Sequence, residues 1–92
     1  MRTLKVTKQF KKDLKRFKNK ENHLKLLDSV LLALLHEKPL DPSYLDHPLM
    51  GNWRGCRECH IMPDFLLIYR VFDEEKILKA ERIGSHSELL KM

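Results

Sequence analysis

Two amphipathic patterns with helical periodicity occupy residues 8–37, and the second ends where Lys38 precedes a proline. In residues 8–18, Phe10, Leu14 and Phe17 recur at the spacing that places side chains on one helical stripe. Residues 23–37 repeat the period with Leu24, Leu27, Leu31, Leu34 and Leu35. Because proline disfavours helical geometry in the residue before it, the second helix is predicted to end near Lys38. Two such helices with a short connection predict a helical hairpin.

The segments on either side of this hairpin have the patterns of strands. Residues 2–6 and 56–61 alternate in polarity, 65–72 form an apolar, aromatic-rich run typical of a central strand, and 76–83 form a last strand. The sequence Asp46-His47-Pro48 is predicted to be a turn, and residues 86–90 a short helical turn. Residues 1–92 are thus predicted to form one α+β domain with the order β-α-α-β-β-β.

Positive charge is concentrated at the N-terminus. The first 20 residues contain nine of the 18 Lys and Arg residues, and Asp13 is their only acid. Such a segment attracts polyanions, most commonly a phosphate backbone, although a solvated helix face explains it equally well. No apolar run approaches the ~20 residues that span a bilayer, and the apolar core of a signal peptide is missing. We therefore expect a cytoplasmic protein without membrane contact.

The sequence Cys56-Arg57-Glu58-Cys59-His60 satisfies the pattern for covalent haem attachment. On a strand, however, Cys56 and Cys59 would face opposite sides of the sheet, so both could not reach one porphyrin edge. A structural zinc site needs four ligands, and the chain has only this cysteine pair. Both cysteines are predicted to be ordinary small side chains, with one facing the core.

Three histidines, His47, His60 and His86, lie in the turn-rich half of the chain. Metal-free RNA cleavage needs a base for the 2′-hydroxyl and an acid for the leaving 5′-oxygen, and histidine can serve as either. It also needs positive charge near the phosphate, which Arg82 could supply. Asp64 could orient a histidine or act as the base itself, and the sequence does not choose between these roles.

Two aromatic side chains are candidates for stacking on a base. Trp53, between two glycines, is predicted to anchor a loop on the core, whereas Phe65 beside Asp64 is the better stacking candidate.

Taken together, these motifs resemble the YafQ branch of the RelE/ParE toxin superfamily, and the resemblance covers nearly the whole chain. The residues that carry it are Asp46-His47-Pro48-Leu49, Gly51, Trp53, Gly55, Arg57, His60, Pro63-Asp64, Leu67-Ile68-Tyr69, Arg82 and Gly84-Ser85-His86.

The resemblance implies a bacterial type II toxin in which two N-terminal helices pack on a mainly antiparallel four-stranded sheet. It implies an endoribonuclease that works without metal or cofactor, enters the ribosomal A site and cleaves translated mRNA. The 2′-hydroxyl would be the nucleophile, and the products would carry a 2′,3′-cyclic phosphate and a 5′-hydroxyl.

The resemblance also implies roles for particular residues. The catalytic set would be His47, His60, Asp64, Arg82 and His86, with Phe65 stacking on RNA. The basic residues of the first helix would bind ribosomal RNA or an acidic antitoxin tail: Lys8, Lys11, Lys12, Lys15 and Arg16. Leu90 departs from the family, which often has an aromatic residue there, so the resemblance does not carry an mRNA-positioning role over to this place.

Two other functions stay open at this stage. ParE-type relatives share the fold but act on DNA gyrase, and they do not need the histidine set. A degenerate member would only bind an antitoxin or RNA. In each case we expect the free chain to be a monomer that joins a larger antitoxin complex.

Overall fold

A computed structural model describes residues 1–90 of the chain. Its five strands form one sheet in the order β1-β5-β4-β3-β2. Strand β1 (Thr3–Val6) pairs in parallel with β5 (Ile77–Gly84), and every other pair is antiparallel. The hairpins join β3 (Arg57–Met62) to β4 (Phe65–Phe72) and β4 to β5. The α+β class and the mainly antiparallel sheet are therefore confirmed.

The predicted four strands are five, because His47–Pro48 forms the short strand β2 and not a turn. Two properties of proline make this strand possible. A residue before proline is confined to extended backbone, and proline is tolerated on an edge strand because no neighbour needs its missing N–H. Strand β2 is the edge strand beyond β3, with His47 opposite Glu58 and Pro48 opposite Arg57.

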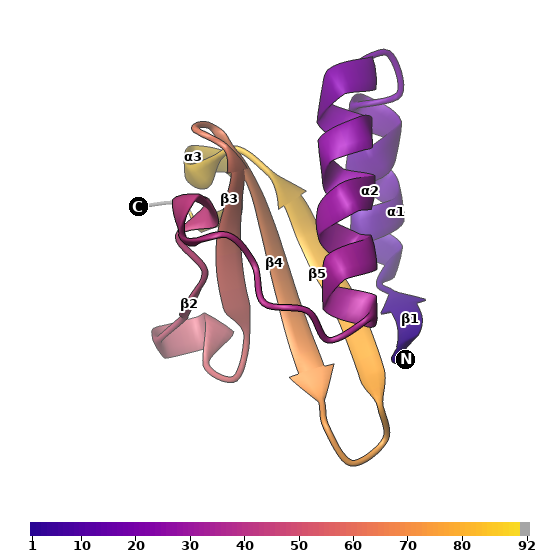
Figure 1. Cartoon of the computed structure of the whole chain (residues 1–92). Helices are drawn as coiled ribbons and strands as arrows, with labels where there is room; N and C mark the ends of the chain where they lie inside the picture. The colour runs from indigo at the N-terminus through magenta and orange to yellow at the C-terminus, as the bar shows by residue number, and fades with distance from the viewer. Residues whose placement is uncertain (91–92) are drawn as a thin grey trace.

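The helical hairpin consists of α1 (Lys8–Arg16) and α2 (Glu21–Leu35), which lie side by side in Figure 1. The Thr7 hydroxyl caps α1, since it accepts a hydrogen bond from the backbone N–H of Phe10 at 2.9 Å. Helix α2 ends at Leu35, three residues before the predicted end near Lys38. None of the helices within residues 1–90 combines the length and the apolar composition needed to cross a bilayer.

The sheet buries apolar side chains on both faces. On the side of α1 and α2, a large core joins Phe10, Leu27 and Leu31 to sheet residues such as Leu67 and Leu78. On the other face, a smaller cluster contains Cys56, Leu66, Ile68 and Leu89, with Leu49, Trp53 and Leu90 packed against it. The short helices η2 (Gly51–Trp53) and α3 (His86–Leu90) supply part of this second cover (Figure 1).

Helix α3 begins with a reciprocal pair of hydrogen bonds. The Ser85 hydroxyl accepts from the backbone N–H of Glu88 at 3.2 Å, and a Glu88 carboxylate oxygen accepts from the backbone N–H of Ser85 at 2.9 Å. This is the capping box of a Ser-x-x-Glu sequence, and it fixes the start of a helix. It therefore also fixes His86, the first residue of α3.

Candidate active site

The register of the sheet brings distant predicted residues into one row. His47 on β2 lies opposite Glu58 on β3, Glu58 opposite Ile68 on β4, and Ile68 opposite Arg82 on β5. Directly opposed residues of an antiparallel pair point to the same face of the sheet. Neighbouring strands lie about 4.8 Å apart, so the backbone of Arg82, two strands away, lies about 10 Å from the backbone of Glu58.

Glu58 is the centre of the candidate site. Its side chain is 2% exposed, yet its carboxylate meets two histidines. Nε2 of His60 lies 3.1 Å from one carboxylate oxygen, and Nε2 of His47 lies 3.8 Å from the other. The two imidazole rings have centroids 6.1 Å apart. A buried carboxylate between two histidines can stabilise positive charge that appears on either ring.

His86 lines a cavity of about 400 Å³ together with His47 and Glu58. The cavity is lined by His47, Leu49, Met50, Asn52, Trp53, Glu58, His86 and Leu90. Thus the structure brings all three predicted histidines to the sheet face that lies away from α1 and α2. Trp53 is half-buried and packs against the apolar cluster of this face, which agrees with its predicted role as a loop anchor.

Glu58 was missed by the sequence interpretation, although a signal for it exists. The alternation of β3 places residues 58 and 60 on one face, so any site built on His60 would include the side chain of Glu58. What the alternation does not show is burial, which makes this carboxylate a strong electrostatic partner.

Arg82 is held at the edge of β5 by a residue outside the predicted set. Its Nε donates to one carboxylate oxygen of Asp13 at 3.1 Å, and one terminal nitrogen donates to the other at 3.0 Å. Asp13 lies on α1 and is 1% exposed. It also accepts from the backbone N–H of Ile83 at 3.2 Å. Burial by itself would raise the pKa of Asp13, but the hydrogen bonds from Arg82, Gln9 and Ile83 outweigh burial and lower it.

The topology explains why an acid is buried at this point. Strand β1 covers the outer edge of β5 only as far as Ala80, so the N–H of Ile83 on the same edge has no strand partner. A buried N–H group without an acceptor is costly, and Asp13 supplies that acceptor. The one acid of the basic segment is therefore part of the sheet edge.

Asp64 and Phe65 do not line the cavity that His47 and His86 share. Asp64 is exposed in the turn between β3 and β4. Phe65 is 1% exposed and packs in the main core, with its ring centroid 4.8 Å from those of Phe17 and His23. The prediction that Phe65 stacks on a base is wrong for this conformation, because the ring has no free face.

The two cysteines lie on opposite faces of the sheet, as the strand pattern predicts. Cys59 belongs to the main core and Cys56 to the smaller cluster. Both are buried, whereas only one was expected to face the core. Burial raises the pKa of the Cys59 thiol to about 12, so it stays protonated at neutral pH. Within residues 1–90, no group of three or more His, Cys, Asp or Glu side chains is arranged to hold a metal ion.

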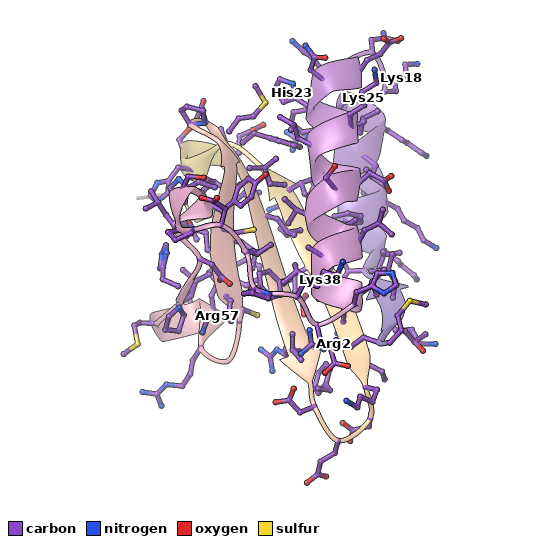
Figure 2. The ribbon with its side chains drawn as sticks, in the orientation of Figure 1. Arg2, Lys18, His23, Lys25, Lys38 and Arg57 are labelled. Carbon is purple, nitrogen blue, oxygen red and sulfur yellow. The ribbon has the colours of Figure 1, made fainter. Side chains whose placement is uncertain are left out.

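The basic residues of α1 divide into two groups. Lys8, Lys11, Lys12 and Lys15 are exposed, and the ion pairs found in residues 1–90 involve none of them. Arg16 instead forms ion pairs with Asp13 on its own helix and with Glu88 on α3. Arg16 therefore ties α1 to the helix that carries His86. Lys18 and Lys25 extend positive charge to the end of the helical pair (Figure 2).

Comparison with known proteins places the chain in one family. Residues 2–91 match the model of the bacterial toxin of type II toxin–antitoxin system, YafQ. The mRNA interferase toxin YafQ of Escherichia coli K12 is 36% identical over 89 residues, which are 96% of this chain and 95% of that protein. The putative toxin YafQ of Haemophilus influenzae is 37% identical over 87 residues, 89% of this chain and 85% of its own.

Solved structures agree in fold. A metal-bound toxin from Helicobacter pylori superposes with a TM-score of 0.88 at 47% identity, covering 97% of this chain and 99% of that one. YafQ in the Escherichia coli DinJ–YafQ complex superposes with a TM-score of 0.85 at 36% identity, covering 97% and 98%. The chain therefore belongs to the YafQ family of toxins of bacterial type II toxin–antitoxin systems.

Proposed function

We propose that this chain is an endoribonuclease that cleaves translated mRNA on the ribosome without a metal or cofactor. The observation that carries the proposal is that His47 and His60 both meet the buried carboxylate of Glu58, while His86 lines the same cavity as His47 and Glu58. The mRNA interferase activity of the Escherichia coli relative supports it. Such a site would act in the cytoplasm, where ribosomes and mRNA are found.

The proposed reaction is a transesterification within one RNA strand. One histidine takes the proton of the 2′-hydroxyl, and the 2′-oxygen forms a bond to phosphorus. The bond from phosphorus to the 5′-oxygen breaks, and a second histidine gives that oxygen its proton. The products carry a 2′,3′-cyclic phosphate and a 5′-hydroxyl. Because no water, oxidant or reductant enters this step, the histidine pair accounts for all the protons that move.

We also propose roles for Arg82 and Asp64, which lie at the margins of the site. Asp13 engages Nε and one terminal nitrogen of Arg82, which leaves the other terminal nitrogen outside that pair. We assign to it the stabilisation of negative charge on the phosphate. For Asp64, which is exposed in the turn between β3 and β4, we propose the role of orienting a histidine.

The proposed partners are ribosomal RNA, mRNA and a cognate antitoxin. The four exposed lysines of α1 form a positive surface that suits RNA or an acidic antitoxin segment. An antitoxin that covered this surface would compete with RNA for it. The free toxin is proposed to be a monomer, which light scattering would check.

The proposal is tested by cleavage of ribosome-bound mRNA in a cell-free extract. The purified chain should arrest translation, and cleavage should persist when EDTA is added at a concentration that leaves the ribosomes intact. Added zinc and copper salts belong in the same series, because the Helicobacter pylori relative was solved with metal bound. Cleavage that EDTA abolished and one metal restored would contradict the metal-free mechanism.

Single variants test the histidine set. His60→Ala and His86→Ala should each lower the cleavage rate ~10²-fold or more, the usual size of an acid or base contribution. His36→Ala is the matched control, since His36 is exposed at the end of α2, away from the cavity. Full activity in both site variants would refute the assignment. Inhibition of DNA supercoiling with mRNA left intact would indicate a gyrase toxin instead.

A further inference from the structure

The segment that carries His47 is held by a cluster outside the predicted site. Asp46, the residue before His47, accepts hydrogen bonds with both of its carboxylate oxygens. One accepts from Nε of Arg57 at 3.1 Å, and the other accepts from the Tyr69 hydroxyl at 2.7 Å. Arg57 and Tyr69 are direct partners across β3 and β4, so the two donors reach Asp46 from neighbouring strands. Arg57 lies at the β2 side of the sheet in Figure 2.

This cluster compensates for the shortness of β2. The strand has two residues, so backbone pairing alone gives His47 little support. Tyr69 is 2% exposed and belongs to the main core, which makes its hydroxyl a rigid donor. Burial also raises the pKa of Tyr69, so the hydroxyl keeps its proton. The carboxylate of Asp46 is thereby anchored to the best-packed part of the sheet.

The residue on the other side of Asp46 fixes the imidazole of His47. Leu45 has φ 52° and ψ 41°, a left-handed conformation that is unusual for leucine. Its carbonyl oxygen lies 2.6 Å from Nδ1 of His47. A carbonyl can only accept a hydrogen bond, so Nδ1 must carry the proton. In the neutral ring, Nε2 then holds the lone pair, and it is Nε2 that faces Glu58.

We propose that Asp46, held by Tyr69 and Arg57, is a positioning residue that fixes this tautomer and makes His47 the general base. The inference rests on the proposed ribonuclease function. It adds to that function the identity of the general base, which the sequence left open. Nε2 of His47 takes the proton of the 2′-hydroxyl as the 2′-oxygen bonds to phosphorus. The carboxylate of Glu58 stabilises the imidazolium that forms, and another histidine protonates the leaving 5′-oxygen.

Two nearly isosteric variants test the proposal on the full chain. Asp46→Asn keeps one oxygen acceptor but loses the second, and Tyr69→Phe removes only the hydroxyl donor. Asp41→Asn is the control, because Asp41 lies in the same loop and accepts a single hydrogen bond, from the Ser43 N–H at 2.9 Å. Thermal unfolding shows whether each variant is folded. Having two variants keeps the test decisive if one is not.

The direct readout is the ¹⁵N spectrum of the histidine rings, in which the two neutral tautomers have distinct shifts. The His47 signals are assigned by their loss in His47→Gln. We expect an Nδ1–H ring in the wild type and in Asp41→Asn, and a mixture with the Nε2–H tautomer in Asp46→Asn and Tyr69→Phe. The two variants should also lower kcat about tenfold, a partial loss of a base contribution, with KM changed less than about twofold.

The outcomes separate this proposal from the function on which it rests. An unchanged His47 tautomer in both variants refutes the positioning role, whether or not the protein cleaves RNA. A changed tautomer with unchanged kcat refutes the assignment of His47 as base. A wild type with the expected Nδ1–H ring that cuts no RNA refutes the ribonuclease function, and the assignment of a base fails with it.

Discussion

Asp13→Ala should destabilise the fold strongly, although Asp13 lies in a helix whose other charged residues are exposed. The carboxylate of Asp13 is 1% exposed and accepts hydrogen bonds from Arg82, from the N–H of Ile83 and from Gln9. Alanine would fit the helix well, so the cost would arise from the groups that lose their acceptor and not from helix propensity.

The magnitude follows from those orphaned groups. Leaving a buried N–H such as that of Ile83 unsatisfied costs about 1–3 kcal/mol. Removing one partner of a buried ion pair costs about 3–5 kcal/mol. Arg82 keeps part of its hydration, since its side chain is 22% exposed, so we expect a total near the lower end, about 3–4 kcal/mol. For a domain of this size, a loss of 3 kcal/mol lowers Tm by about 12–24 °C.

Urea unfolding followed by circular dichroism measures this loss directly. The midpoint should fall while the slope of unfolding free energy against urea stays the same. Asp28→Ala is the matched control, because Asp28 is exposed on α2, and it should change stability by less than about 0.5 kcal/mol. A loss below about 1 kcal/mol in Asp13→Ala, with the slope unchanged, would refute the view that this carboxylate completes the edge of β5.

The carboxylate of Asp13 should also make the stability of the fold depend on pH. Hydrogen bonding lowers the pKa of folded Asp13 below its ordinary value of 3.8. Its contribution to stability is therefore fully present above that value and is lost as pH falls through the lower pKa of the folded state. The stability difference between the wild type and Asp13→Asn should be constant near neutral pH and shrink below about pH 4. A difference that grew on acidification would contradict the proposed charge state.

Two further predictions concern α3 and the lysines of α1. Ser85→Ala should cost about 1 kcal/mol in urea unfolding, because it removes one half of the capping box with Glu88. Ser29→Ala, whose exposed hydroxyl bonds only within α2, should cost less than about 0.5 kcal/mol, and equal losses would argue against the cap. Replacing Lys11 and Lys12 by alanine should reduce the slope of log affinity for single-stranded RNA against log salt by about 1.4. An unchanged slope in fluorescence anisotropy would show that RNA binds elsewhere.

Features that depend on local sequence were predicted correctly. The apolar period of residues 8–37 identified α1 and α2. The alternation around Cys56 and Cys59 placed the two thiols on opposite faces. Each of these properties involves residues within about four positions of one another, where side-chain geometry follows directly from backbone period.

Features that depend on pairing between distant segments were not predicted. The strand at His47–Pro48 exists only because β3 provides a partner, and the extended backbone that proline imposes on His47 does not by itself distinguish a strand from a turn. The burial of Phe65 depends on the helical hairpin that covers one face of the sheet. Asp13 is structural because β1 ends at Val6, opposite Ala80, and leaves the rest of the β5 edge without a strand partner. Glu58 was missed as well, although the period of the strand gave a local signal for it by placing it on the same face as His60.

These long-range contacts give α1 two roles that are physically inseparable. A nine-residue helix is marginal by itself, so α1 depends on contacts such as Phe10 in the core and Asp13 at the edge of β5. The same contacts hold Arg82, while Arg16 pairs with Glu88 on the helix that carries His86. The exposed lysines occupy the other sides of this helix. The positive surface and the arginine of the proposed site therefore form together, and loss of Asp13 should weaken both at once.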